Sequence, residues 1–288
     1  MKLTQCYLCG SDSFHVIHKG VRGDGTIDAL QCDVCGLVRL SEVMDDSDDF
    51  YRNSGMRDGQ AEPLEKLRLE TKDDDERRFR FTEKMITNKR VLDFGCGDGG
   101  YLLRAKAVAN EVCGVEMERS VREGLQAEGV HCYERITEVG QVDVVTMFHV
   151  LEHLPNPAEV LQEIKGYIAP DGMLIVEVPN ADDALLSLYH CKAFADFTYW
   201  KCHIYLYTVD TLRLLAKKAG LQVKFMRQVQ RYPLENHLYW LSKGKSGGHF
   251  EWSFMGNDVL NRQYGAMLAN LGVADTIICG LCGTGRWL

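Results

Sequence analysis

The chain has 288 residues, of which 45% are hydrophobic, and it carries a formal net charge of −8. This length and composition allow a full core in roughly one large and one small domain, and they exclude a disordered or fibrous chain. The apolar stretches are far shorter than the roughly 20 residues of a membrane span, and the start lacks an apolar signal core. We therefore expect a cytoplasmic protein with no membrane insertion. With 41 acidic against 33 basic residues, we expect no nucleic-acid partner.

Four of the eleven cysteines fall into two matching knuckles, CYLCG at Cys6 and Cys9 and CDVCG at Cys32 and Cys35. Two residues between thiolates let a tight turn aim both sulfurs at one ion, and the following glycine lets backbone amides turn back toward them. Because sulfur would fill all four positions of a tetrahedral site, the ion would be structural and not catalytic. The sequence therefore predicts a zinc-ribbon-like module over residues 1–40.

A charged segment follows over residues 41–89, which we interpret as a linker that becomes helical and serves as a lid. The charge run from Lys72 to Arg78 is typical of a solvated helix face. Phe50 and Tyr51 are aromatic residues inside an acidic stretch. They either fold over a ligand or pack on the domain.

Residues 90–230 alternate short apolar runs with amphipathic stretches, which is typical of strands and helices in turn. Between the first five strand candidates, the spacings fit crossover helices, so we predict an α/β fold. Its sheet would be Rossmann-like, seven-stranded and mostly parallel, with helices on both faces and the zinc-binding module beside it. Residues 231–288 would form an extension on the acceptor side. The strand candidates are VLDFG from Val91, VCGVEM from Val112, VHCY from Val130, VDVVTMF from Val142, GMLIVEVP from Gly172, LQVKFM from Leu221 and DTIICGL from Asp275.

The ligand signal lies in VLDFGCGDGG. Gly95, Gly97 and Gly99 follow a strand and precede a helix, where a glycine turn lets a ligand approach the backbone. Glu116 ends the next strand, 116 − 95 = 21 residues later, and a carboxylate there accepts hydrogen bonds from both ribose hydroxyls of an adenosine. Gly95, Gly97 and Gly100 also satisfy GxGxxG, so spacing alone leaves an NAD-dependent oxidoreductase open.

Asp93 separates these alternatives, because it is placed to receive the ammonium of an amino-acid group, and a dinucleotide needs no anion there. VLDFGCGDGG, Glu116 and VDVVTMFHVLEHLPNP together resemble the class I S-adenosylmethionine (SAM) dependent methyltransferases over roughly residues 75–230. The resemblance implies that the methionine part of SAM, its ribose, its adenine and its methyl-donor side each meet residues of these motifs. The implied SAM-binding residues are Asp93, Gly95, Cys96, Gly97, Glu116, Met117 and Phe148.

The order of motifs along the chain resembles that of one group of these methyltransferases. The CxxCG knuckles, the SAM domain and HIYLYTVDTLRLLAKKAGLQV resemble bacterial methyltransferases that act on nucleotide-linked sugars and surface-polysaccharide precursors. The C-methylating members carry Tyr-His-Glu-His before that helix, whereas this chain has Trp200, Lys201, Cys202 and His203. The resemblance therefore implies O- or N-methylation of a small acceptor, a nucleotide-sugar.

A hydroxyl acceptor benefits from a base, and a neutral histidine can take its proton as the new bond forms. The candidates are His149, His153 and His203, of which His149 and His203 rank highest, with Tyr199 one place out of register. His149, Glu152 and His153 also share one face if they are helical, which raises a metal hypothesis. A similar stretch in some quinone-pathway O-methyltransferases has a glutamate at the place of His149 and uses a divalent ion.

The tail from Arg231 mixes basic residues with aromatic ones, which suits a nucleotide-sugar surface or an ordinary packed hairpin. Three rival functions stay open beside the sugar methyltransferase. They are a zinc-module RNA base methyltransferase, the NAD-dependent oxidoreductase, and a non-catalytic module that binds SAM or a partner.

Overall fold

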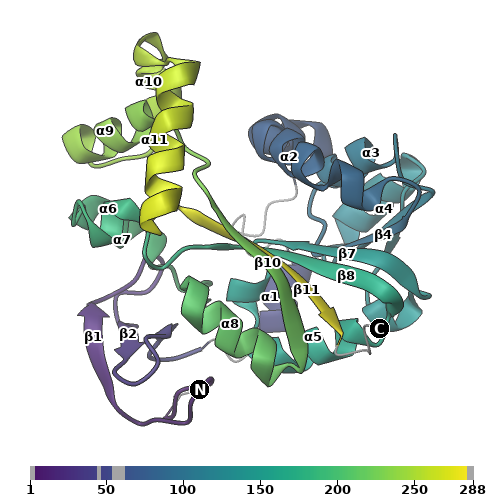
Figure 1. The fold of residues 1–288 in the computed structure, drawn as a ribbon, viewed down its shortest axis with the longest axis horizontal. Coiled ribbons are helices and arrows are strands. Elements are labelled where there is room, and N and C mark those ends of the chain that lie inside the picture. The colour runs from purple at the N-terminus through teal and green to yellow at the C-terminus, as the bar shows by residue number, and fades with distance from the viewer. Residues whose placement is uncertain (1–3, 44–46, 54–61, 284–288) are drawn as a thin grey trace.

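The computed structural model describes residues 4–43, 47–53 and 62–283. Its main feature is a seven-stranded sheet in the order β10-β11-β8-β7-β4-β5-β6 (Figure 1). All pairs from β8 to β6 are parallel, whereas β11 runs antiparallel to both of its neighbours. This confirms the predicted mostly parallel sheet and its seven strands. They are β4 (Arg90–Phe94), β5 (Glu111–Val115), β6 (His131–Tyr133), β7 (Val142–Phe148), β8 (Ile168–Pro179), β10 (Leu221–Val229) and β11 (Thr276–Gly283).

Helices cover both faces of this sheet, which explains why its inner strands read as continuous apolar runs. On one face pack α2 (Leu64–Ile86), α3 (Gly100–Ala105) and α4 (Arg119–Ala127), and on the other α5 (Pro157–Lys165) and α8 (Val209–Lys218) (Figure 1). Helix α8 begins at a side-chain cap, because the Thr208 side chain accepts a hydrogen bond from Thr211 N at 3.2 Å.

The N-terminal module is joined to the main chain through a second sheet. Its strands β1 (Phe14–His18), β2 (Ala29–Cys32) and β3 (Val38–Leu40) continue into β9 (Tyr205–Leu206), which belongs to the segment predicted as the SAM-binding core. Lys218 Nζ in α8 donates to Tyr7 O at 2.7 Å. The module is therefore anchored on the side of the sheet that carries α5 and α8.

The linker segment contains α1 (Ser47–Arg52) and α2; its residues 44–46 and 54–61 lie outside the described part of the chain. The prediction of a solvated face holds for only part of the charge run in α2: Lys72 and Asp73 are exposed, whereas other charges of the run are buried or paired. Asp75 is buried at 4% exposure, and Arg77 and Arg78 reach Glu177 of β8. These charges are needed because they pair with a buried carboxylate. That carboxylate lies far along the chain, so the local pattern cannot show the pairing.

Residues 231–283 do more than extend the fold. Helices α9 (Leu234–Lys243), α10 (Gly248–Glu251) and α11 (Asp258–Leu271) stand away from one end of the sheet (Figure 1), and the chain then returns as β11 between β8 and β10. Within the described residues, no helix is long and apolar enough to cross a membrane. The remaining helices are η2 (Ile136–Glu138), η3 (Leu151–His153), α6 (Ala184–Ser187), α7 (Lys192–Thr198) and η4 (Ser253–Met255).

Candidate active site

The glycine loop after β4 is folded back over the end of β5. Gly95 N and Cys96 N both donate to Val115 O, at 2.8 and 3.1 Å. Gly95, Gly97 and Gly99 have φ angles of 73°, 51° and 72°, in the left-handed region that disfavours other residues. The run of glycines is thus explained by the backbone path of the loop.

The three glycines differ in what surrounds them. A Cβ atom on Gly95 would lie 2.5 Å from Val150 Cγ2, and one on Gly99 would lie 2.3 Å from Leu125 Cδ2. A Cβ on Gly97 would meet nothing within 4 Å. Gly95 and Gly99 therefore allow close packing, whereas Gly97 presents bare backbone to open space, which is what a ligand approaching the loop requires.

Glu116 lies against this open stretch of the loop. Its Oε2 accepts from Gly97 N and its Oε1 accepts from Glu118 N, both at 3.0 Å. Each carboxylate oxygen has a second lone pair for a hydroxyl donor, and the side chain is only half-buried. Met117 is also half-buried and follows directly. The pair thus fits the predicted ribose and adenine contacts of SAM.

Two of the predicted SAM-binding side chains lie beneath the loop. Asp93 is 3% exposed and accepts from Thr146 Oγ1 at 2.7 Å, and burial raises its pKa to about 7. The Cys96 thiol is buried 3.7 Å from Cys132 Sγ. Phe148, at the end of β7, is buried as well.

His149 begins the turn after β7 in the left-handed conformation, with φ of 56°. Its Nδ1 lies 3.2 Å from Glu152 Oε1, and its Nε2 lies 3.2 Å from Glu177 Oε1 and 3.1 Å from Arg231 Nη1. Burial and Arg231 lower its pKa, but the hydrogen bonds to the two glutamates outweigh them and raise it above the ordinary value. Both ring nitrogens are engaged, so neither is free to take a proton from an acceptor.

Glu177 organises this ion-pair network and was not found from the sequence. It is fully buried in β8, and it accepts from Arg77 and Arg78 of α2 at distances of 2.9 to 3.0 Å. Arg231 in turn pairs with Asp74. The one local signal is a lone charge inside the apolar run MLIVEVP, which predicts a buried partner without identifying it.

A second cluster lies next to His149 and contains Glu152, His153 and His203, whose potential ligand atoms lie within 4.8 Å of one another. His153 Nδ1 contacts Cys202 O at 2.8 Å, and His203 Nδ1 contacts Thr198 O at 3.1 Å. Because a carbonyl only accepts, each Nδ1 carries the hydrogen and each neutral ring keeps its lone pair on Nε2. Burial and the neighbouring His153 lower the pKa of His203 to about 4, so it is neutral at pH 7.

Aromatic side chains border this cluster. The Tyr51 and Trp200 rings both meet His153 edge-on, with centroids 6.0 Å away. Tyr51 therefore packs beside the candidate site. Tyr199 instead packs against His18 in a tilted arrangement, with centroids 5.0 Å apart, within an apolar cluster of the N-terminal module. The structure thus brings His149 and His203 to the same region and leaves Tyr199 out of it.

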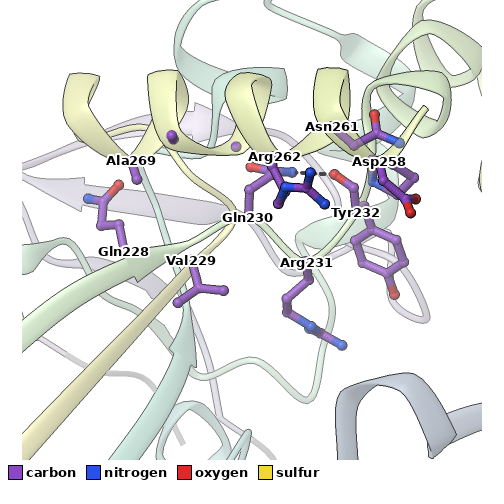
Figure 2. A pocket seen from close by; sticks show the side chains of 12 residues that line it. Gln228, Val229, Gln230, Arg231, Tyr232, Asp258, Asn261, Arg262 and Ala269 are labelled. Atoms are coloured by element: carbon purple, nitrogen blue, oxygen red, sulfur yellow. Dashed lines mark hydrogen bonds between the residues drawn. The ribbon is translucent and has the colours of Figure 1, made fainter. Parts of the chain in front are cut away.

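The C-terminal tail forms helices α9 and α10 instead of the packed hairpin of the alternative interpretation, and only some of its aromatic residues are packed. Trp240 is buried against the Phe194 ring, and His237 is buried with its Nδ1 2.8 Å from Tyr264 Oη. A pocket of about 450 Å³ lies between β10 and α11, with Gln228 and Arg262 among its lining residues (Figure 2). Its lining includes no residue of the glycine loop or of the histidine cluster.

The four knuckle cysteines converge. Cys6 Sγ lies 3.4 Å from Cys35 Sγ, Cys9 Sγ lies 3.6 Å from Cys32 Sγ, and all four sulfurs lie within 4.8 Å of one another. A tetrahedral zinc with Zn–S bonds of about 2.3 Å needs sulfurs roughly 3.8 Å apart. The glycines after the two pairs have matching φ angles of 76° and 78°. The donors therefore fit a zinc ion.

Residues 66–224 match the model of a protein family described as Methyltransferase domain. The chain is 31% identical over 183 residues to the ubiquinone biosynthesis O-methyltransferase of Bordetella pertussis, a match that covers 57% of this chain and 75% of that protein. It is also 31% identical over 170 residues to the protein of the same name from Aeromonas salmonicida, covering 52% and 70%.

Among solved structures, the fold is similar to a SAM-dependent methyltransferase from Archaeoglobus fulgidus, with a TM-score of 0.50 and 18% identity over 76% of this chain and 94% of that one. Three observations indicate the same family: the glycine loop with Glu116 beside it, the sheet order and the family match. The chain belongs to the methyltransferase-domain family and is a SAM-dependent methyltransferase.

Proposed function

We propose that this enzyme transfers the methyl group of SAM to a hydroxyl oxygen of a small acceptor, which lies at the carboxyl end of β7. The observation that carries this proposal is the histidine cluster directly after β7, where neutral rings offer lone pairs beside the methyl-donor side. Relatives named as O-methyltransferases support the choice of oxygen. Ligands of open parallel sheets bind at this edge, which supports the location.

SAM supplies an electrophilic methyl group on a sulfonium when it is bound. In the proposed complex, the Gly97 backbone and the Glu116 carboxylate hold its ribose side, and Met117 packs on its adenine. Asp93, held by Thr146 under the loop, attracts the ammonium of its methionine part. Holding the acceptor oxygen about 3 Å from the methyl, in line with sulfur, supplies most of the rate acceleration.

We assign the base role to His203. The acceptor O–H bond breaks toward His203 Nε2 while the oxygen forms its bond to the methyl and the methyl–sulfur bond breaks. His149 is unsuited because Glu152 and Glu177 occupy its nitrogens. Tyr199 is unsuited because burial raises its pKa to about 12 and its ring packs against His18.

For the acceptor, we favour a hydroxyl on an aromatic ring. The edges of Tyr51 and Trp200 border the cluster and suit a flat apolar group. The nucleotide-sugar acceptor was expected from the domain layout, and the aromatic tail offered a surface for it. Its residues Trp240 and His237 are packed, and this removes most of that support. The nucleotide-sugar remains the alternative outcome of the test below.

We also propose that Cys6, Cys9, Cys32 and Cys35 hold a structural zinc ion. The support is the convergence of four free thiols at tetrahedral spacing. Sulfur alone would saturate this ion, so it would take no part in methyl transfer.

The test presents the purified enzyme and trideuteromethyl SAM with a catechol and, separately, with a nucleoside-diphosphate sugar. We expect a mass gain of one labelled methyl group on an oxygen of the catechol. His203→Ala should lower kcat by about 100-fold or more while SAM affinity is unchanged. The matched control is His131→Ala, since His131 is exposed at the start of β6. Transfer of the methyl group only to the sugar would show that the acceptor is a nucleotide-sugar. An unchanged kcat in His203→Ala would refute the role of His203 as the base.

A further inference from the structure

Residues 234–271 form a helical arm, made of α9, α10, η4 and α11, that stands away from the main sheet (Figure 1). Sixteen large hydrophobic residues are exposed in the described part of the chain, and eight of them lie on this arm. Scattered apolar residues are ordinary on a surface, whereas their concentration on one protruding unit marks an interaction surface. The eight residues are Leu241, Phe250, Phe254, Met255, Val259, Leu260, Met267 and Leu271.

The longest helix of the arm carries an apolar stripe on its outer face. Leu260, Met267 and Leu271 are exposed and 7 and 4 residues apart, so they lie on one side of α11 over about 16 Å of its length. The buried residues of α11, Tyr264 and Leu268, pack in a separate apolar cluster inside the fold. The stripe is therefore not needed to hold the arm on its own chain.

The charges around the stripe indicate what kind of partner would cover it. Its polar neighbours on the exposed side of α11 are Gln263 and Asn270, which carry no charge. The exposed charges of the arm nearly balance, with three basic residues against two acidic ones. They are Lys243, Lys245 and Arg262 against Glu251 and Asp258. Such a set gives little attraction for an anionic lipid surface or a nucleic acid, so an uncharged apolar partner suits this face best.

We propose that a second copy of this chain covers the arm, with the two α11 helices antiparallel about a two-fold axis beside Met267. In this arrangement Leu260 of each copy lies beside Leu271 of the other, because the two leucines are on opposite sides of the axis. The stripe is complementary to itself, as a two-fold interface requires, and no like charges meet along it. The antiparallel helix dipoles also interact favourably.

The exposed area of the arm is sufficient for a stable dimer. Phe250 and Phe254 are 74% and 80% exposed. An aromatic side chain removes roughly 150–250 Å² from water on burial, so these two offer roughly 300 Å². The other six residues, between 44% and 61% exposed, bring the total to the order of 800 Å², which is about the area that each partner buries in an interface of standard size.

The test measures the mass of the full chain in solution by sedimentation equilibrium at micromolar concentrations. We expect a dimer with twice the 32.6 kDa mass of the chain. Met267→Glu places two like charges at the axis and should raise the dimer dissociation constant by about 100-fold or more. The matched control is Leu214→Glu, which changes an exposed leucine of α8 outside the arm and should leave the dimer intact. SAM binding by each variant reports its folding.

A charge swap gives a second readout that a folding defect cannot imitate. Met267→Glu and Met267→Lys should each be monomeric alone and should form a dimer when mixed in equal amounts, because opposite charges then meet at the axis. A wild-type chain that stays monomeric, a dimer that Met267→Glu leaves unchanged, or a mixture that stays monomeric would each overturn the proposal. Binding of a monomeric wild type to phosphatidylcholine vesicles would overturn it as well and would assign the face to a lipid surface.

Discussion

The contrast between Gly97 and Gly99 gives a sharp prediction about the SAM site. Both residues have a left-handed backbone, so alanine at either costs roughly 1–2 kcal/mol in conformational energy. Gly97 faces open space, and Gly97→Ala should therefore fold with little further loss. The new methyl group would occupy the position at which SAM approaches the loop.

Gly99→Ala has a different cost. Its Cβ would lie 2.3 Å from Leu125 Cδ2, and Leu125 is fully buried and has little room to move. Overpacking of this kind adds roughly 1–3 kcal/mol, so the total loss is about 2–5 kcal/mol. That is a large share of the roughly 5–15 kcal/mol that stabilises a typical domain.

Urea unfolding and calorimetric SAM binding measure the two effects separately. We expect Gly97→Ala to keep most of its stability and to bind SAM at least about 100-fold more weakly, which corresponds to about 2.7 kcal/mol. Gly99→Ala should lose stability first, with SAM affinity less affected in the fraction that is folded. Wild-type SAM affinity in Gly97→Ala would refute the placement of SAM on this loop.

Three further predictions concern stability and metal content. Glu177→Gln removes the buried charge that Arg77 and Arg78 share, so urea unfolding should show a loss of about 3–5 kcal/mol; a loss below about 1 kcal/mol would contradict the network. Burial lowers the pKa of His237 to about 4, so the unfolded chain binds the extra proton between pH 6.5 and 4 and stability falls as the pH drops through that window, by up to about 3 kcal/mol. His237→Asn should remove this contribution and leave that of His203, whose pKa is also lowered to about 4; an equal loss of unfolding free energy between pH 7 and 4.5 in the variant and the wild type, measured by urea unfolding, would refute the prediction. Cys9→Ser should lose one equivalent of zinc in metal analysis and unfold at lower temperature with SAM affinity kept; full zinc content would contradict the four-sulfur site.

Features set by neighbouring residues were predicted correctly. The run VDVVTMF predicts a strand buried on both faces, and the structure has β7 there with five of its residues buried in succession. The positive φ angles of the glycine loop follow from the glycines themselves. The turn within each pair of knuckle cysteines is also local, whereas the contact between the two pairs was predicted from their matching spacing.

Features that depend on distant residues were missed. HVLEH has a helical spacing, but His149 lies outside the helical turn. Its ring contacts Glu177 and Arg231, which lie 28 and 82 residues away along the chain. No local period indicates that His203 joins Glu152. DTIICGL was recognised as a strand, yet its place between β8 and β10 depends on the antiparallel return after α11.

The most direct test of the central claim is to incubate the enzyme with methyl-labelled SAM and a cell extract, and to follow the label into small molecules, RNA and protein. We predict that the label enters a small molecule as an O-methyl group, and that this labelling is lost in Gly97→Ala and retained in His131→Ala. Label that enters RNA or protein, or that is bonded to carbon, would contradict methyl transfer to the oxygen of a small acceptor.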